Sequence, residues 1–393
     1  MPRPTNAFVR YKLPASGIEP TAAPETVVSG LPLTGDHPMH PIAIDSQGNL
    51  YVDLGSATNS CQSQNRMPNV PGNNPCTELE TLAGTWRYDA NKLDQHFSSA
   101  ERFVTGLRNG EGISFDSAGR IFVTQHGRDQ LGQNWPKLYT LKQNANLPAE
   151  ELLQLRQGAD FGWPECYYDD VQKKLVLAPE YGGDGGKAVG VCSQKEAPVA
   201  AFPAHWAPND MLIYEGNQFP SAYKDGAFIA FHGSWNRAPE PQGGYNVVFQ
   251  PLADGKPSGP FVVFADGFAG AYRSPVERHT AQPDWRSGPM GRCISRTIRA
   301  AASGALPTRA EINRPELRPR RHRVPRQERR PPPMFCRQRA SIRTPARHRS
   351  RHRPGPHRIS SHWANAFSRD KPMAGPVRDV TAPTAKAQRW VPI

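Results

Sequence analysis

The chain has 393 residues, with 48 Lys and Arg residues against 35 Asp and Glu residues. The sequence contains no run of eighteen apolar residues, so it predicts no membrane-spanning helix. Charge divides the chain in two: residues 1–270 carry 20 basic and 28 acidic side chains, and residues 271–393 carry 28 basic and 7 acidic ones. We expect a mildly acidic folded domain followed by an Arg- and Pro-rich tail without a core, because the tail lacks an apolar period.

The front part repeats a strand–turn–strand unit. In chain order the copies are HPIAIDSQGNLYVDLGS (40–56), EGISFDSAGRIFVTQHG (111–127) and DMLIYEGNQFPSAYKDGAFIAFHGS (210–234). Turns that place Asp near Gly between runs of Ile, Val, Phe and Tyr are hairpin signals. A long-period repeat of short antiparallel strands predicts an all-β propeller. A sandwich also has short strands, but it does not repeat such a unit.

Further elements are expected between the repeats. Strands are predicted at GTWRYDAN (84–91), KLYTLKQ (137–143) and YNVVFQPL (245–252). One helix is predicted at PAEELLQLRQG (148–158), because Pro at the start and Gly at the end are ordinary helix boundaries.

Four of the six cysteines flank two loops. Cys61 and Cys76 bracket a segment rich in Asn, Pro and Gln, and Cys166 and Cys192 bracket one rich in Gly and Tyr. This placement predicts two disulfides and an oxidising compartment; the alternative is four free thiols in a cytosolic protein. The opening MPRPTNAFVRYKLP has no apolar stretch after its basic residues, so no signal peptide is expected in this chain. Disulfides without an export signal lead us to expect a truncated N-terminus.

The basic tail has two interpretations. RPELRPRRHRVPRQERRPPP (314–333) is typical of an arm that binds nucleic acid. We favour a shifted reading frame, because Gly288 to Ile298, back-translated and shifted by two bases, is compatible with PDGALYISDD, one more strand–turn–strand unit. In the same frame residues 375–381 are compatible with TCAGCH, a CxxCH haem-attachment motif. We therefore predict that the frame slipped near residues 272–280, leaving a disordered tail that binds no nucleic acid.

Five motifs follow one another along the chain: GDHPMHPIAIDSQGNLYVDLGS, RNGEGISFDSAGRIFVTQHGRDQ, DFGWPE, HWAPNDM and FIAFHGSWNR. Together they resemble the PQQ-dependent glucose/sorbosone dehydrogenases, and their sorbosone dehydrogenase-like branch most closely. The resemblance covers roughly residues 8–270 and implies a six-bladed propeller with PQQ and calcium at its axis. In this chain the first blade is expected to be partial and the last lost. The expected division is a dehydrogenase domain at 1–270 and the tail at 271–393.

The resemblance also implies a function in carbohydrate metabolism. A periplasmic quinoprotein would oxidise an aldose or sorbosone-type sugar by hydride transfer to the quinone and pass electrons to an acceptor such as a c-type cytochrome. Haem c is expected only in the unshifted parent, because the chain itself has no CxxCH. Two alternatives stay open: a calcium-dependent propeller lactonase or other hydrolase, and an inactive propeller remnant.

His37 matches the catalytic base of the family. Hydride transfer from a sugar C–H requires removal of the neighbouring hydroxyl proton, and an imidazole that titrates near neutral pH suits this task. Better-known members carry an Asp that orients this histidine, whereas Ser56 stands at the matching position here. Asp36 is the candidate substitute for that Asp.

The resemblance assigns cofactor contacts as well. Arg108 and Asn109 match residues that bind PQQ, and an arginine can stabilise charge that develops on a quinone oxygen. Gly127 and Arg128 match positions whose backbone carbonyls hold calcium, an ion that takes oxygen ligands. Further cofactor or sugar contacts are expected from His126, His205, His232, Trp235 and Arg237. Glu111 is expected near the site, and Trp163 is expected to pack between blades.

Overall fold

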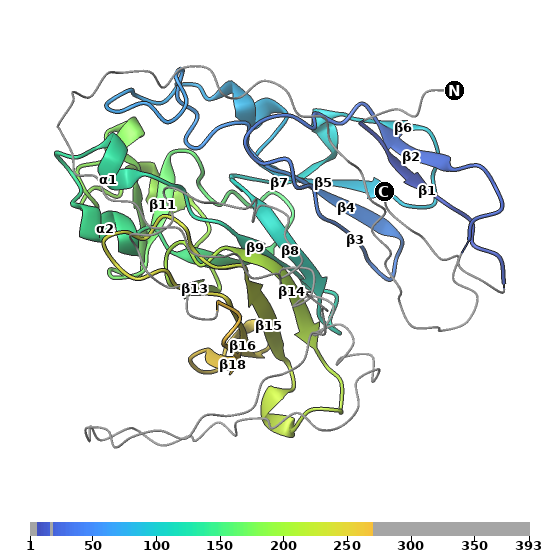
Figure 1. The fold of residues 1–393 in the computed structure, drawn as a ribbon. Coiled ribbons are helices and arrows are strands. Elements are labelled where there is room, and N and C mark those ends of the chain that lie inside the picture. The colour runs from blue at the N-terminus through green and yellow to red at the C-terminus, as the bar shows by residue number, and fades with distance from the viewer. Residues whose placement is uncertain (1–5, 16–18, 270–393) are drawn as a thin grey trace, which may run out of the picture. The chain divides into compact units, whose positions relative to one another are not determined.

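The structure is a computed structural model that describes residues 6–15 and 19–269, and most of its regular elements are strands (Figure 1). Its first large sheet is antiparallel and has the order β3 (Ile42–Ile44), β4 (Asn49–Leu54), β5 (Gly84–Asp89) and β7 (Arg102–Thr105). The turn between β3 and β4 forms because Asp45 Oδ1 accepts hydrogen bonds from the backbone N–H groups of Gln47 and Asn49. The first strand–turn–strand unit is thereby confirmed.

Two more antiparallel sheets repeat this order. The second contains β8 (Gly110–Phe115), β9 (Ile121–Gln125), β10 (Glu150–Leu155) and β13 (Ala200–Phe202). The third contains β14 (Pro208–Tyr214), β15 (Gly226–Phe231), β16 (Asn246–Ala253), β17 (Lys256–Pro257) and β18 (Val262–Ala265). Apart from β18, which pairs with β16, each strand is a neighbour of the preceding strand of its own sheet, which is the topology of propeller blades. The fold is therefore the predicted all-β propeller class, whereas the six blades and the partial first and lost last blade stay predictions.

Smaller elements connect these sheets. β1 (Phe8–Arg10) pairs antiparallel with β2 (Glu25–Ser29), which pairs in parallel with β6 (Gln95–His96). β11 (Cys166–Asp169) and β12 (Lys174–Leu177) form a hairpin. The described helices are α1 (Leu131–Asn134), α2 (Leu141–Asn146) and short 3-10 turns at Thr77–Glu80, Ser99–Glu101, Pro179–Tyr181, Gly190–Gln194 and Ser221–Tyr223. In the described part of the chain, no helix is long and apolar enough to cross a membrane.

Two predicted elements are wrong. The segment expected to be a helix at 148–158 forms strand β10, because it pairs with β9 on one side and β13 on the other and buries Leu152 and Leu153. The strand expected at 137–143 is replaced by α2, where Thr140 and Gln143 form a reciprocal capping box. Tertiary pairing overrode local propensity in the first case, and a cap signal went unrecognised in the second. The strands expected at 84–91 and 245–252 are confirmed as β5 and β16.

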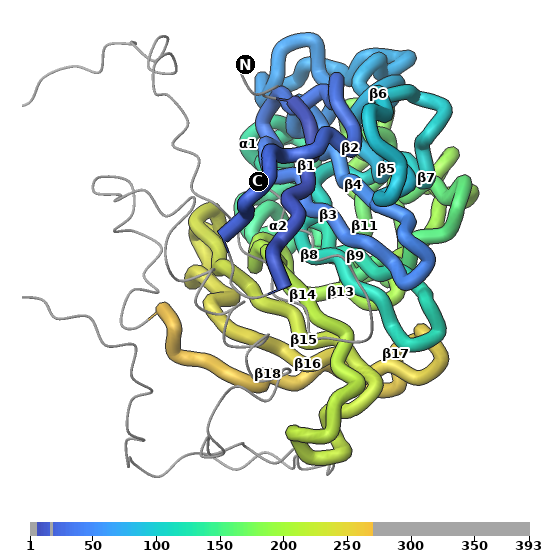
Figure 2. The backbone as a smooth tube through the Cα atoms, turned by 90° about the vertical axis from the view of Figure 1, so that its right-hand side faces the viewer, coloured from blue at the N-terminus to red at the C-terminus, as the bar shows by residue number. Residues whose placement is uncertain are grey.

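The second and third sheets pack side by side through their first strands, β8 and β14 (Figure 2). The backbone N–H of Ile213 donates to Ser114 Oγ at 3.1 Å, and Thr124 Oγ1 donates to the Pro208 carbonyl at 2.9 Å. At Gly112 a Cβ atom would lie only 2.5 Å from the backbone nitrogen of Met211, so only glycine permits this approach. Apolar side chains of both sheets fill the space between them, among them Phe122, Leu152, Phe202, Met211, Ile229, Phe231 and Val248.

All described residues belong to one compact unit of the chain. The predicted frame slip, the haem-attachment motif of the shifted frame and the tail expected to be disordered at 271–393 lie outside the described residues, as does the question of nucleic-acid binding by that tail.

Candidate functional site

His37 lies in the segment before β3, and only 7% of its surface is exposed. Its Nδ1 atom is 2.7 Å from the Ser56 carbonyl oxygen and 3.0 Å from Ser56 Oγ. Gly55 makes the approach possible, since a Cβ there would lie 2.8 Å from His37 Cβ. Burial, reinforced by the positive charge of Arg108, lowers the pKa of His37 to about 3. The imidazole is therefore neutral at physiological pH.

Asp36 does not orient His37, so that part of the prediction is wrong. Its carboxylate accepts hydrogen bonds from Asn65 Nδ2 at 2.8 Å and Arg66 Nε at 3.1 Å. The guanidinium is a stronger partner than a neutral imidazole because it brings opposite charge as well as a donor. Ser56 is the residue that contacts His37.

Arg108 precedes β8 and is buried, with 4% of its surface exposed. Its Nε donates to the Asn59 carbonyl at 3.1 Å, and its Nη2 donates to Asn59 Oδ1 at 2.8 Å. Nη1 donates to the Gly127 carbonyl at 3.1 Å, and Nη2 also contacts Asp129 Oδ2 at 3.3 Å. A guanidinium has five N–H groups, so these contacts leave one N–H of Nη1 for a ligand. Burial lowers the pKa of Arg108 to about 10, which keeps it charged near neutral pH.

Asp129 joins several parts of the site. Its Oδ2 accepts from Arg66 Nη1 at 3.1 Å as well as from Arg108, and its Oδ1 accepts from Asn236 Nδ2 at 2.8 Å. His205 Nδ1 lies 3.9 Å from Oδ1. Burial would raise the pKa of Asp129, but the two guanidinium groups outweigh it and hold the pKa well below its usual range.

Four residues of the site had no predicted role: Asp129, Arg66, Asn59 and Asn236. Two of them stand in motifs that could have indicated a role: Asp129 directly follows the Gly127–Arg128 pair in QHGRDQ, and Asn236 lies inside HGSWNR. Arg66 and Asn59 stand in a loop without regular structure, where spacing alone predicts no contact.

Asn109 and His126 carry buried atoms that require a partner. Asn109 Oδ1 and His126 Nε2 have no hydrogen-bond partner among the described residues. Burial and Arg108 lower the pKa of His126 to about 3, so its ring is neutral. Asn109 Nδ2 is 3.4 Å from Glu111 Oε1, and burial raises the pKa of Glu111 to about 8. Glu111 is thus protonated at neutral pH.

A small cavity lies behind Arg108. Its volume is about 20 Å³, and its lining includes His126, Glu151, Trp163 and Tyr167. That volume holds about one water molecule and is far too small for a tricyclic quinone. A cofactor of that size would therefore not fit inside this cavity.

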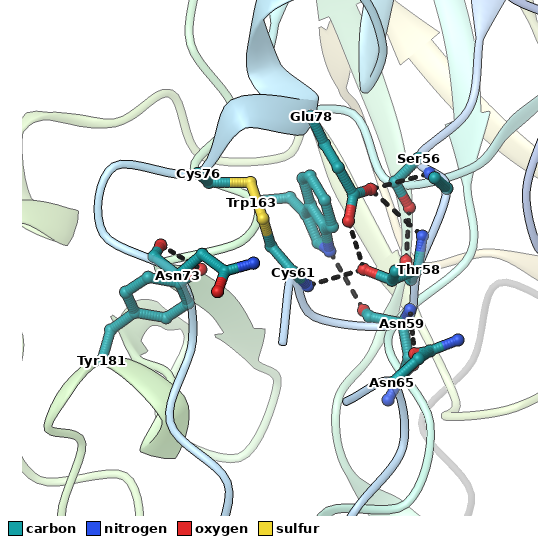
Figure 3. Close-up of a disulfide and its surroundings, with 11 residues drawn as sticks. Ser56, Thr58, Asn59, Cys61, Asn65, Asn73, Cys76, Glu78, Trp163 and Tyr181 are labelled. Carbon is teal, nitrogen blue, oxygen red and sulfur yellow. Dashed lines mark hydrogen bonds between the residues drawn. A yellow bond between two sulfur atoms is a disulfide. The ribbon is translucent and has the colours of Figure 1, made fainter. Parts of the chain in front are cut away.

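The loop that carries Ser56 and Asn59 is held in place by a disulfide (Figure 3). Cys61 is joined to Cys76, and Cys166 to Cys192, as the sequence predicted. Trp163, expected to be structural, packs against Cys61 and donates from Nε1 to the Asn59 carbonyl at 3.1 Å. The disulfide and the indole therefore fix the carbonyl that also binds Arg108.

Four cofactor-binding residues were predicted from later blades, and only some of them lie near Asp129 in the structure. His205 is buried beside Asp129, and its Nε2 lies 2.7 Å from the Asn144 carbonyl. Arg237 donates to the Ala204 carbonyl at 2.8 Å instead of to an acidic group of the site. His232 Nδ1 lies 3.2 Å from the Gly233 carbonyl, and Trp235 is 57% exposed. Trp235 is thus free of the core, next to the Asn236 that binds Asp129.

Gly127 and Arg128, the two residues predicted to bind calcium through their carbonyls, both make other contacts in the structure. Gly127 O accepts a hydrogen bond from the Arg108 cation. The side chain of Arg128 forms a buried ion pair with Glu180 and therefore has a structural role. Within residues 6–15 and 19–269 no cluster of three His, Cys, Asp or Glu side chains could hold a metal. The residues do not fit a divalent cation at Gly127 while Arg108 keeps this contact, because like charges would meet there.

Fold and site define an all-β, propeller-type protein in which a neutral histidine adjoins a buried arginine–aspartate cluster. Residues 4–262 match the TrAA12-like family, and the chain belongs to that family. This confirms the predicted relationship to the PQQ-dependent sugar dehydrogenases, while the sorbosone-type branch stays a prediction.

Individual relatives cover shorter stretches. A pyrroloquinoline quinone-dependent pyranose dehydrogenase of Coprinopsis cinerea is 32% identical over 164 residues, which are 37% of this chain and 21% of that protein. An uncharacterized protein of Borreliella burgdorferi is 27% identical over 144 residues, 34% of this chain and 30% of that protein. The calcium structure of Trichoderma reesei Carbohydrate-Active Enzymes Family AA12 has a TM-score of 0.49 at 21% identity, covering 65% of this chain and 63% of that one. The chain thus spans less than a third of the curated relatives' length.

Proposed function

We propose that this chain is a PQQ-dependent oxidoreductase that oxidises an aldose or sorbosone-type sugar by hydride transfer to the quinone. The proposal rests mainly on the buried, neutral His37 next to Arg108 and Asn109. One N–H of Arg108 Nη1 and the Oδ1 atom of Asn109 remain available to hydrogen-bond a ligand. Membership in the TrAA12-like family and the pyranose dehydrogenase of Coprinopsis cinerea support the choice of cofactor and substrate class.

The available groups fit an anionic quinone. The remaining N–H of Arg108 Nη1 would donate to a cofactor oxygen, and Asn109 Oδ1 would accept from an N–H donor or an ordered water. When bound, PQQ supplies the acceptor for the hydride that leaves the sugar carbon. His37 would take the hydroxyl proton at Nε2, because its Nδ1 faces two oxygen atoms of Ser56. A base whose pKa is about 3 is weak, but negative charge placed beside it raises that pKa.

The prediction that the Gly127 and Arg128 carbonyls bind calcium would require Arg108 to leave the Gly127 oxygen. The hydrolase alternative has no supporting observation, since the described residues hold no cluster of three metal-ligating side chains.

The two disulfides favour an extracellular or periplasmic location, because such bonds persist in oxidising compartments. We propose the periplasm, with a c-type cytochrome or a similar carrier as the electron acceptor and no haem in this chain.

The test uses the full chain with added PQQ. We expect the wild type to bind PQQ, seen by absorbance of the protein fraction after gel filtration, and to reduce a redox dye when aldoses are added. His37→Gln should still bind PQQ but reduce dye at least about 100-fold more slowly, the range lost with a general base. His96→Gln is the matched control, because His96 is exposed on β6. A folded wild-type chain that retains no PQQ contradicts the proposal.

A further inference from the structure

We infer that Ser56 is a positioning residue that fixes His37 in the tautomer with hydrogen on Nδ1 and a free electron pair on Nε2. This inference rests on the proposed function, in which Nε2 is the base. The family resemblance leads one to expect an orienting carboxylate at position 56. In this chain the neutral side chain of Ser56 takes its place.

Hydrogen counting assigns the tautomer. Ser56 Oγ lies 2.7 Å from the carbonyl oxygen of Thr58, which can only accept, so the single hydroxyl hydrogen points there. Ser56 Oγ therefore presents an electron pair to His37 Nδ1 at 3.0 Å. The Ser56 carbonyl, at 2.7 Å from the same nitrogen, is also an acceptor. Two acceptors converge on Nδ1, so this nitrogen carries the hydrogen.

The partners of Ser56 are themselves held. Glu78 accepts hydrogen bonds from Thr58 N at 3.1 Å and from Thr58 Oγ1 at 2.5 Å (Figure 3). Thr58 Oγ1 also accepts from the backbone N–H of Cys61 at 2.8 Å, which links this chain of contacts to the disulfide. Ser56 is fully buried, and its backbone N–H donates to the Arg108 carbonyl at 2.7 Å. The hydroxyl thus has one direction available.

The charges around His37 have opposing effects on its protonation, and a neutral partner leaves these effects unchanged. Arg108 opposes protonation of the ring, whereas Asp129 and Asp36 favour it. A carboxylate at position 56 would add negative charge directly at Nδ1 and would bring a second buried acid close to Arg108. A serine hydroxyl orients the ring without changing this balance, because it carries no charge.

The first readout needs no cofactor. Long-range 1H–15N NMR of the cofactor-free full chain should show His37 with hydrogen on Nδ1. Ser56→Ala removes one of the two acceptors, and we expect exchange of the Nδ1 hydrogen with water to become about fivefold faster, the equivalent of about 1 kcal/mol for one hydrogen bond. Ser56→Thr, which keeps the hydroxyl, should restore slow exchange. Ser29→Ala is the matched control, because Ser29 Oγ lies 3.0 Å from Nδ1 of the exposed His96.

The second readout uses the protein loaded with PQQ. Ser56→Ala should lower kcat for dye reduction about fivefold with KM unchanged, because the serine acts through His37 and does not touch the sugar. Hydrogen on Nε2 in the wild type would overturn the inference, as would Ser56→Ala exchange no faster than in the wild type. If the tautomer and its response to Ser56→Ala are as expected but no sugar is oxidised, the proposed function fails while the tautomer assignment stands.

Discussion

Replacing Arg108 by methionine separates function from stability at the centre of the site. The side chain binds four acceptors, but three of them have another donor. The Asn59 carbonyl keeps Trp163 Nε1, Asn59 Oδ1 keeps the backbone N–H of Asp129, and Asp129 Oδ2 keeps Arg66. Only the Gly127 carbonyl loses the donor described for it, which costs about 1–3 kcal/mol when the oxygen is buried.

An opposing contribution comes from the charge. Burial lowers the pKa of Arg108 from 12.5 to about 10, so the charged form is less favourable in the folded than in the unfolded chain by about 3 kcal/mol. Methionine removes that cost and fills much of the same volume. The two effects nearly cancel, and we expect Arg108→Met to change the free energy of unfolding by no more than about 2 kcal/mol.

Cofactor affinity should respond differently. A hydrogen bond from a charged donor contributes about 1.5–3 kcal/mol, so the loss of Arg108 should weaken PQQ binding about 10- to 100-fold. Urea unfolding followed by tryptophan fluorescence gives the first quantity, and titration with PQQ gives the second. A loss of 4 kcal/mol or more, on the order of a broken buried ion pair, together with unchanged PQQ affinity would show that Arg108 is structural and refute the reasoning.

Other changes test the supporting structure. Arg128→Met leaves the fully buried Glu180 without its cation and should cost about 3–5 kcal/mol in urea unfolding; a cost below 1 kcal/mol would contradict the buried ion pair. Replacing Cys61 and Cys76 by alanine opens a loop of 15 residues and should lower stability by about 3 kcal/mol, measured against the wild type under oxidising conditions; equal stability would show that the bond does not form in solution. Acidification from about pH 6.5 to 3 should destabilise the wild type relative to His37→Gln, because His37 is protonated over that window only when unfolded; a wild type that gains stability relative to this variant as pH falls would count against a neutral His37.

The strand–turn–strand units were predictable because each carries its own turn chemistry. Asp45 caps the turn of its own hairpin, so a few neighbouring residues suffice to specify the local structure. The disulfides were predictable for a similar reason, since each pair brackets a single loop. β10 was not, because Glu150–Leu155 becomes a strand only through two partners distant in the sequence, β9 and β13.

In the site, too, some residues could be predicted from the sequence and others could not. His37, Arg108 and Asn109 stand in motifs whose residues resemble a known family, and the structure brings them together. The contacts that set their properties run between segments far apart in the chain: Asn59 to Arg108, Asp129 to Asn236, and Ser56 to His37. No spacing rule encodes such contacts, so the orientation of His37 through Ser56 rather than Asp36 became visible only in the folded chain.

The most direct test of the account is the reduction of protein-bound PQQ by sugar, followed by absorbance after rapid mixing. The account predicts that the wild-type chain reduces bound PQQ when an aldose is added, and that His37→Gln binds PQQ but reduces it at least about 100-fold more slowly. Equal rates in the two proteins would contradict the assignment of His37 as the base.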